Sequence, residues 1–527
     1  MVILNRVGHV ERVGNLMKST CSTRSTRLIS AVLVALAFSI GAFGDASPAC
    51  NPAAWRPRER WRGFNLEGKA IKGKFSGEWR ESDLAMMHEL GFNFARIMID
   101  HRYWCKDDDW TQPDPAKFGP IDEVIAWGRK HQIHIQICFS FPPGIDVVTK
   151  SKKALFTDPV AHRALATHWA YFARRYKGIP NDELSFNLFN EPEQNGTEEN
   201  YAPLIRDTTA AIHAEDPARF VVIDGLEWGR NPELAAIQMP VGQSHHAYVP
   251  MTVTSYKASW ISGAKDWDVP IWPPYPVSGP IFGARKPATH RAPIVIRDVP
   301  ACELTLRTGV FNREVELVVE ADGKTLFARH YVPSPKESCW TNLVLRPGGT
   351  EWGGCLKEPV RVGVPACERL AVRMGRGDWL ELKALEFAAG GQKASLPLSS
   401  EWSTPLRREM RFAGFGASCP FATLDGRSYT GDDYLDACKN AAWKPVFDAG
   451  QFVMVGEFGV YNKTPHDVAL RWMEDNLRRW KEKGIGWALW NFRGPFGILD
   501  STREDVQYED FHGHKLDRKM LELLQRY

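Results

Sequence analysis

The stretch FNLFNEPEQ, residues 186 to 194, joins two patterns that seldom meet. Apolar residues lead, as in a buried strand, straight into Asn190, Glu191 and Pro192. A buried strand ordinarily ends in turn residues that face water, and proline stops strand pairing because it lacks an N–H donor. The stretch is therefore either an ordinary strand end or a strand that holds Glu191 at the mouth of a site.

A short apolar strand followed by an amphipathic helix recurs around this stretch. Segments such as ESDLAMMHELG (81–91) place apolar residues at helical spacing and end in glycine. Six such units in succession predict parallel strands joined by crossover helices. The predicted strands are RWRGFNL (60–66), FNFARIMI (92–99), IHIQICF (133–139), LSFNLFN (184–190), RFVVIDG (219–225) and QSHHAYV (243–249).

The rhythm breaks between residues 277 and 427 and then returns. The interrupted region consists of short β-like runs joined by glycine, proline and Asp-Gly turns, which is typical of a β-sandwich. Two further strands, 451–459 and 485–492, follow it and bring the total to eight. The sequence predicts an α/β fold: a (β/α)8 TIM barrel formed by residues 47–276 and 428–527, with an all-β domain, 277–427, inserted between strands six and seven.

The first 46 residues have the pattern of a signal peptide. Arg24 and Arg27 precede the apolar run 28–44, which is short for a membrane span, and small residues precede a cleavage point after Ala46. An uncleaved anchor helix is the alternative. Export predicts a secreted protein, extracellular or periplasmic, that leaves the membrane after cleavage.

Charge and cysteine content agree with export. The formal net charge of +3 lies entirely in residues 1–46, so nothing in the mature chain favours a nucleic acid or an anionic membrane as partner. The cysteines lack CxxC or zinc-type spacing, which favours disulfides over metal. Cys138, inside an apolar run, is the expected unpaired thiol, and the four cysteines between residues 302 and 367 are candidates to pair among themselves.

In a barrel of this kind, functional side chains gather at the C-terminal ends of the strands. Glu191 ends strand four and Glu457 lies near the end of strand seven, so the two carboxylates are expected to face each other across the barrel mouth. Two facing carboxylates, one protonated and one ionised, are what glycoside cleavage needs. The other candidate residues at strand ends are Arg96, Asn190, His246, Tyr248 and Trp490.

Each of these side chains has a chemical use beside a carboxylate pair. The permanent charge of Arg96 keeps a neighbouring carboxylate ionised, and Tyr248 can hydrogen-bond the nucleophile. Asn190 can bind a sugar hydroxyl, and Trp490 offers an apolar face to a sugar ring. His245 and His246 are adjacent on a strand and must face opposite ways, so no metal site is expected. Glycoside cleavage by two carboxylates requires no cofactor, so none is expected.

Together these residues make both barrel segments resemble glycoside hydrolase family 5, a family of retaining barrel glycosidases. The resemblance implies that Glu191 is the acid/base, Glu457 the nucleophile, and Arg96, Asn190, His246, Tyr248 and Trp490 supporting residues that bind substrate. It also implies cleavage of a plant-type β-glucan polysaccharide or oligosaccharide, with endo-β-1,4-glucanase activity favoured. A β-mannanase or other β-glycosidase of the family, and a non-catalytic carbohydrate-binding protein on a relic barrel, are the alternatives.

One departure from the family pattern lies at the end of strand three. The family has a histidine there, whereas this chain has Ser140 or Phe141, and His101 or His134 are the candidates to replace it. The sequence leaves open the sugar and linkage, endo or exo action, disulfide connectivity and oligomeric state. It also leaves open whether the insertion shapes the cleft or binds carbohydrate through Trp340, Trp352 and Trp379.

Overall fold

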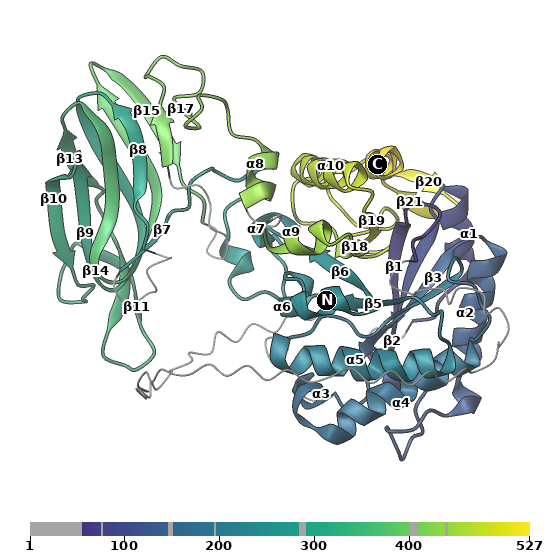
Figure 1. Cartoon of the computed structure of the whole chain (residues 1–527). Coiled ribbons are helices and arrows are strands. Elements are labelled where there is room, and N and C mark those ends of the chain that lie inside the picture. Colours follow the sequence, from purple (N-terminus) through teal and green to yellow (C-terminus); the bar gives the residue numbers. More distant parts are fainter. Residues whose placement is uncertain are drawn as a thin grey trace, which may run out of the picture.

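The eight predicted barrel strands lie side by side in one closed barrel of parallel strands (Figure 1). The computed structural model describes residues 55–74, 77–145, 151–193, 196–283, 291–400, 409–437 and 441–527. The barrel strands, in their order around it, are β1 (Arg62–Lys69), β19 (Gly486–Leu489), β18 (Val453–Phe458), β6 (Gly242–Ala247), β5 (Val221–Asp224), β4 (Leu184–Asn187), β3 (His134–Phe141) and β2 (Phe94–Asp100). The predicted fold class is confirmed.

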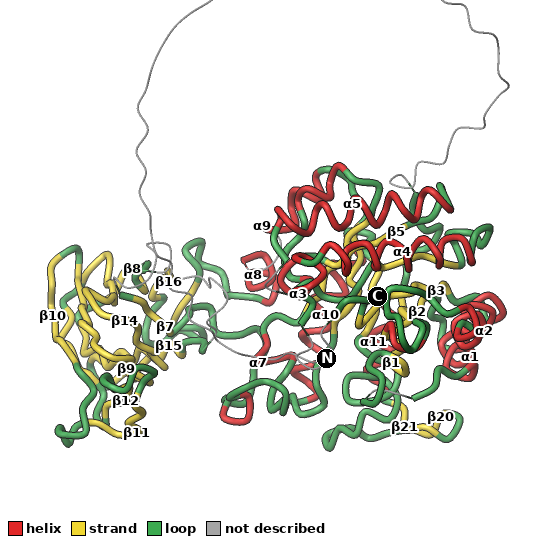
Figure 2. Tube along the Cα trace, turned by 90° about the horizontal axis from the view of Figure 1, so that it is seen from below, coloured by secondary structure: helices red, strands yellow, loops and turns green. Residues whose placement is uncertain are grey.

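Helices surround the barrel (Figure 2). In α4 (Pro159–Arg175), Asp158 caps the first turn by accepting from Val160 N, and Pro159 takes the first helical position, where its missing N–H costs nothing. The buried face of α4 includes Leu165, Trp169 and Phe172. The remaining helices are α1 (Glu81–Glu89), α2 (Gly119–Lys130), α3 (Lys153–Thr157), α5 (Glu198–Glu215), α6 (Leu226–Gly229), α7 (Met251–Thr254), α8 (Gly431–Leu435), α9 (Ala441–Asp448), α10 (His466–Glu482) and α11 (Arg518–Arg526), with short 3₁₀ helices η2 (His101–Tyr103), η3 (Pro115–Lys117), η4 (Leu234–Gln238) and η5 (Ala264–Asp266).

The interior of the barrel changes from apolar to polar along its axis. Near the N-terminal ends of the strands, Trp61, Phe94, Phe220 and Met454 form a buried apolar cluster. Further along the strands, fully buried polar side chains such as Arg96 take over. A polar group buried in this way must find a hydrogen-bond partner, so this half of the interior is where a network of charges is expected.

The insertion between β6 and β18 forms a mostly antiparallel 11-stranded sheet with a core of its own, set beside the barrel (Figure 1). Its two long strands, β9 (Cys302–Ala321) and β14 (Cys367–Ala389), pair with each other across several irregularities that allow a strand pair to bend. The other strands are β7 (Pro280–Phe282), β8 (Ile294–Val299), β10 (Lys324–Tyr331), β11 (Trp340–Leu345), β12 (Trp352–Leu356), β13 (Val360–Val364), β15 (Gln392–Pro397), β16 (Glu409–Phe412) and β17 (Phe421–Ala422); a small hairpin, β20 (Glu509–Phe511) and β21 (His514–Leu516), follows β19. The all-β insertion is confirmed, and the exact domain limits at 276 and 427 stay predictions.

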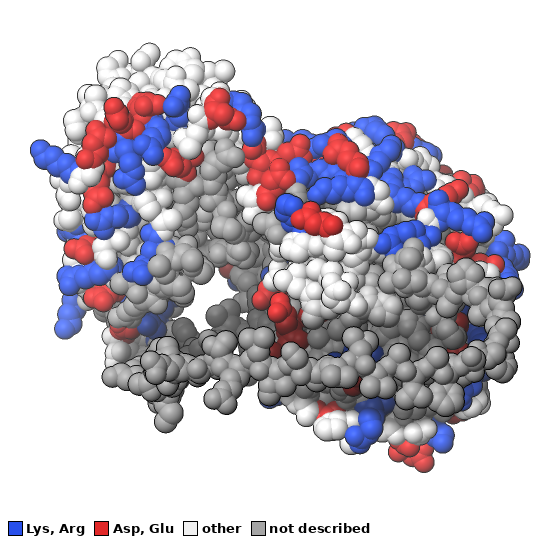
Figure 3. All heavy atoms as spheres, in the orientation of Figure 1, with Lys and Arg blue, Asp and Glu red and all other residues white. Residues whose placement is uncertain are grey.

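The sequence also predicted disulfides and a mature chain without net charge. Among the described residues, Cys105, Cys138 and the cysteines of the insertion are free thiols, so the disulfides expected there are absent from the structure. In the strand pairing Cys302 lies opposite Val364 and Cys367 lies opposite Val299. Acidic and basic side chains are interspersed over the face shown in Figure 3.

The expected signal peptide lies outside the described residues. Within the part of the chain that the structure describes, no helix is both long and apolar enough to cross a membrane. Secretion therefore stays a prediction.

Candidate active site

The two predicted catalytic carboxylates lie together at the C-terminal end of the barrel. Glu191 follows β4, and Glu457 lies in β18. One oxygen of each carboxylate and one ring nitrogen of His246 lie within 4.8 Å of one another. All three side chains are buried, Glu191 at 8% exposure and the other two at 1%. The structure thus places both carboxylates in a single site, with an imidazole in contact range of each.

Glu457 is held by two donors. Arg96 Nη1 donates to Glu457 Oε1 at 2.9 Å, and the Tyr248 hydroxyl donates to Oε2 at 3.1 Å. Burial raises the pKa of Glu457. The positive charges of His246 and Arg96 lower it and the negative charge of Glu191 raises it further, and the pKa stays above its usual value. The two donors fix the orientation of the carboxylate and favour its ionised form.

Arg96 is the centre of a buried polar network. Its guanidinium donates to Asn187 Oδ1 at 2.8 Å, to Asn65 Oδ1 at 3.0 Å and to Asn190 Oδ1 at 3.0 Å, and it pairs with Asp224 Oδ2 at 3.1 Å. Arg96 and Asp224 are fully buried. Every donor direction of the rigid guanidinium fork is thereby used, which ties β1, β2, β4 and β5 together beneath the cleft.

His246 links three carboxylates. Its Nδ1 lies 3.0 Å from Glu191 Oε1 and 3.7 Å from Glu457 Oε2, and its Nε2 lies 3.0 Å from Asp224 Oδ2. Burial lowers the pKa of His246, but the charges of Glu457 and Asp224 and its hydrogen bonds raise it to about 10. His246 is therefore an imidazolium at neutral pH.

The pKa of Glu191 moves the other way from that of Glu457. Burial raises it, but the hydrogen bond and charge of His246, with a further contribution from Lys152, bring it below its usual value. The lowered pKa of Glu191 and the raised pKa of His246 favour the proton on His246, at the other end of a 3.0 Å hydrogen bond to Glu191. A proton that moves along that bond converts Glu191 to the acid form without any change in the net charge of the site.

Trp490 forms one wall of the cleft that also contains Glu191 and Glu457. It is 5% exposed and packs in one cluster with Met98, Phe141 and Tyr248. This packing fixes the ring in place, as a platform for a sugar ring requires.

The end of β3, where a family histidine was expected, is filled differently. The Ser140 hydroxyl donates to Ala70 O at 2.5 Å, and Phe141 lines the cleft. His134 stacks on Phe94 at the start of the strands, and His101 Nδ1 contacts Phe141 O at 3.0 Å. Neither histidine lines the cleft, so neither replaces the missing one, whereas Lys152 does line it.

The sequence reasoning missed Asp224 and Lys152. Asp224 ends the predicted strand RFVVIDG, and a carboxylate at a barrel strand end was a signal that could have been read in the same way as Glu191. Lys152 had no such signal, because it follows a glycine- and proline-containing loop rather than a strand.

No metal site was expected, but one cluster of side chains in the described residues could in principle bind a metal ion. Glu191, His246 and Glu457 form a group of side chains of the kinds that ligate metals. A protonated imidazole has no lone pair for a metal, so the raised pKa of His246 favours proton chemistry over metal binding. The absence of a metal stays a prediction.

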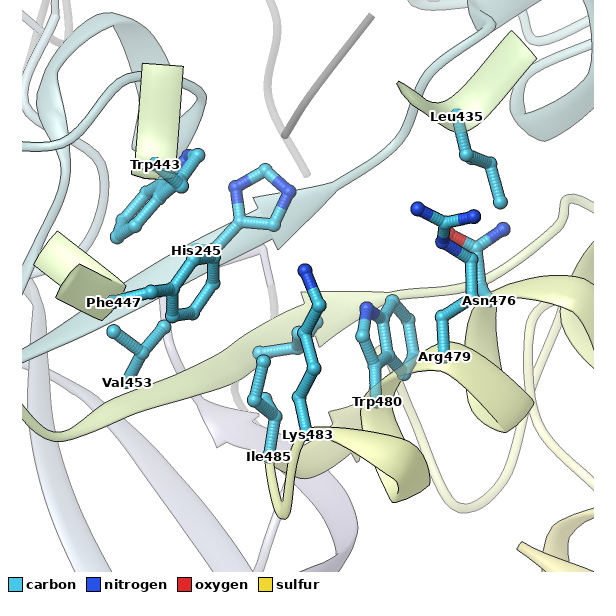
Figure 4. Close-up of a pocket in the computed structure, with 11 residues that line it drawn as sticks. His245, Leu435, Trp443, Phe447, Val453, Asn476, Arg479, Trp480, Lys483 and Ile485 are labelled. Carbon is cyan, nitrogen blue, oxygen red and sulfur yellow. The ribbon is translucent and has the colours of Figure 1, made fainter. Parts of the chain in front are cut away.

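His245 points away from this group, as expected for adjacent residues on a strand. Figure 4 shows it on the outer side of the barrel wall, in a pocket that Trp443, Phe447 and Lys483 also line. The ring centroids of His245 and Trp443 are 5.0 Å apart, and His245 Nδ1 contacts Gly229 O at 3.0 Å. The two histidines therefore cannot share a ligand.

The other tryptophans divide between packing and open surfaces. Trp104 and Trp272 are buried in the barrel core, and Trp340 is buried in the core of the insertion, so these three are packing residues. Trp110 is 38% exposed. Trp267 lines a hollow of about 570 Å³ between the loop after β6 and the inserted sheet. Because Trp340 is in the core, Trp340, Trp352 and Trp379 do not form one exposed platform.

Comparison with known proteins agrees with this geometry. Residues 53–269 match the family described as Cellulase (glycosyl hydrolase family 5). This first segment of the barrel is therefore similar to glycosyl hydrolase family 5. The matched residues include Arg96, Asn190, Glu191, His246 and Tyr248, whereas Glu457 and Trp490 lie beyond the inserted domain.

Two curated relatives of this chain carry endoglucanase names. Endoglucanase C of Acetivibrio thermocellus is 25% identical over 189 residues, 35% of this chain and 54% of the relative. Endoglucanase 3 of Fibrobacter succinogenes is 24% identical over 217 residues, 38% of this chain and 32% of the relative. The chain thus spans about half the length, or less, of these curated relatives.

Solved structures resemble the chain over most of its length. A crystal structure described as that of a glycoside hydrolase is 25% identical, with a TM-score of 0.56, and the match covers 89% of this chain and 99% of the other. Thermotoga maritima Cel5A in complex with cellobiose is 15% identical, with a TM-score of 0.50, and the match covers 88% and 96% of the two chains. The second likeness concerns the fold alone.

Proposed function

We propose that this protein is a retaining β-glycoside hydrolase. The observation that carries the proposal is the spacing of the carboxylates, whose oxygens lie within 4.8 Å of each other in one buried cleft. Retaining enzymes keep the two carboxyl groups about 5–5.5 Å apart, whereas inverting enzymes need about 6.5–9.5 Å to admit a water molecule. The spacing here leaves no room for that water between carboxylate and sugar.

In the proposed reaction Glu457 attacks the anomeric carbon while Glu191 protonates the leaving oxygen. Arg96 and Tyr248 orient the attacking oxygens, at 2.9 and 3.1 Å. A covalent glycosyl-enzyme forms, and Glu191 then acts as a base that takes a proton from water as the water attacks the same carbon. Two inversions at one carbon give net retention.

His246 supplies the proton in this proposal. Substrate binding removes water from the cleft, and a dry cleft disfavours the separated charges of an imidazolium beside a carboxylate. The proton then moves from His246 Nδ1 to Glu191 Oε1 over 3.0 Å, which leaves a neutral imidazole and an acid ready to protonate the leaving group. After bond cleavage Glu191 is ionised, as its second role requires.

The favoured substrate is a β-1,4-linked glucan, cut within the chain. The endoglucanase names of the curated relatives support this, and one related structure is described as Cel5A with mannotriose, which keeps a β-mannan as the alternative. Other β-glycosides of the family, and carbohydrate binding without turnover, remain as rivals. Export to the periplasm or the exterior, where such polymers occur, fits the predicted signal peptide.

The test is release of reducing sugar by residues 47–527 from carboxymethyl cellulose, mixed-linkage β-glucan, glucomannan, mannan and xylan. Glu457→Ala should abolish release, because it removes the nucleophile, and Glu199→Ala should retain it, because Glu199 is exposed at the start of α5. Undiminished activity in Glu457→Ala would refute the mechanism. A folded protein that binds one polymer but cleaves none of the polymers or small aryl glycosides would favour the binding-only rival.

A further inference from the structure

Lys152 has an unusual environment for a lysine. It is 6% exposed, although lysine is among the residues least often buried, and it lines the catalytic cleft. Its Nζ donates to two consecutive carbonyl oxygens, those of Asn190 and Glu191, the second at 3.0 Å. Both residues lie in the segment that follows β4.

The contact is reciprocal. The carboxylate of Glu193 accepts from the backbone N–H of Lys152, so side chain and backbone of one residue hold both sides of Pro192. Lys152 directly precedes α3, and Ala161, Leu165 and Trp169 of the following α4 belong to the main barrel core. The clamp therefore connects the end of β4 to a well-packed part of the barrel.

Glu191 needs such a clamp because its backbone is strained. Its φ is +49°, a left-handed conformation that non-glycine residues seldom adopt. Its N–H donates to Asp224 Oδ2 at 2.9 Å on one side, and its carbonyl accepts from Lys152 on the other. The peptide groups on both sides of this Cα are thus held by buried charged groups, and the direction of the side chain follows from the backbone.

Lys152 also acts on Glu191 through its charge. Burial and His246 have the largest effects on the pKa of Glu191, and the charge of Lys152 has the next largest. The charge of Lys152 lowers this pKa. A cation beside a carboxylate that must release and regain a proton in each cycle makes its conjugate acid stronger.

We propose that Lys152 is a positioning residue for the acid/base Glu191: its side chain holds the carbonyls on both sides of the strained Glu191 Cα and brings a positive charge to the cleft. The inference rests on the proposed function, and it adds a residue whose effect should appear only in steps that move a proton through Glu191.

The chain offers a matched pair of variants. Lys152→Met removes the buried charge and both hydrogen bonds, Lys152→Arg keeps a charge and donors, and Lys153→Met removes the exposed neighbouring lysine as the control. The substrates are a natural-type β-glucan oligosaccharide, whose leaving group needs protonation, and 2,4-dinitrophenyl β-cellobioside, whose leaving group does not. All proteins are checked for folding by their thermal transition.

Lys152→Met should lower kcat/KM on the oligosaccharide by roughly 10- to 100-fold and on the dinitrophenyl glycoside far less, because part of the contribution of general acid catalysis is lost. The alkaline limb of its pH profile, where the hydrogen-bonded pair of His246 and Glu191 loses its shared proton, should move to higher pH, because the lost cation had favoured the loss of that proton. Lys152→Arg should keep the wild-type limb, and Lys153→Met should match the wild type throughout. Equal losses on both substrates with an unmoved limb would overturn the proposal in favour of a merely structural lysine.

A second readout does not depend on turnover. In protein labelled with ¹³C at the glutamate carboxyl carbons, the Glu191 signal, assigned by its disappearance in Glu191→Gln, should titrate at higher pH in Lys152→Met and unchanged in Lys153→Met. If Lys152→Met does not fold, Lys152→Ala and Lys152→Gln replace it. An unchanged titration would overturn the proposal even if no substrate is cleaved, whereas a shifted titration without any activity would count against the proposed function alone.

Discussion

Replacing Arg96 by methionine should destabilise the barrel by about 3 kcal/mol, although methionine fills much of the same volume. Arg96 has 0% exposure and pairs with Asp224 and Glu457, which are 0% and 1% exposed. Removing one partner of a buried ion pair costs about 3–5 kcal/mol, because the remaining charge is left without compensation. Glu457 can take up a proton from the cleft, but Asp224 cannot reach water.

The lower end of this range applies because His246 Nε2 remains 3.0 Å from Asp224 and compensates part of its charge. The assay is differential scanning calorimetry, in which about 3 kcal/mol corresponds to a fall in Tm of roughly 4 °C for a barrel of this size. Arg175→Met is the control, since its pair with Asp122 is about one-third exposed and such pairs contribute about 1 kcal/mol or less.

Asp224→Asn in the Arg96→Met background provides the decisive comparison. Because asparagine carries no charge, the double variant should regain about half of the lost stability. If Arg96→Met melts as high as Arg175→Met, or if the second substitution makes the loss larger, then the buried charge of Asp224 is not what Arg96 stabilises.

Three further outcomes are expected. The pKa of His246 is about 10 in the folded protein, against a usual value of 6.5. The stability that protonated His246 gives to the fold is therefore fully present below pH 6.5 and is lost as the pH rises through 10. His246→Gln should abolish this pH dependence of Tm, and a dependence that persists in the variant would contradict the raised pKa. Tyr248→Phe should lower kcat about 10-fold with little change in KM, because it removes one hydrogen bond to the ionised Glu457, and a change confined to KM would contradict this. Trp490→Ala should raise KM for oligosaccharides by roughly 10-fold, because it removes an apolar face of the cleft, and an unchanged KM would remove Trp490 from the binding surface.

Local patterns predicted much of the site because parallel strands bring their C-terminal ends to one edge. Glu191 and Glu457 could be placed together from strand count alone, as could Arg96 and Tyr248. Asp224 could have been included by the same logic. The disulfides were expected from cysteine counts and export, but counts carry no geometry, and the described cysteines are free thiols.

What the sequence by itself determined is the barrel, its inserted β domain and the strand ends at which chemistry is possible, because alternation and helical spacing are local properties of the chain. Only the tertiary structure decided where the proton resides and how Glu191 is held. Arg96 and Glu457 are 361 positions apart, and His246 and Glu191 are 55 apart, yet each pair meets within about 3 Å. The charge state of such a cluster depends on distances between atoms that many strands position together, and no local pattern contains those distances.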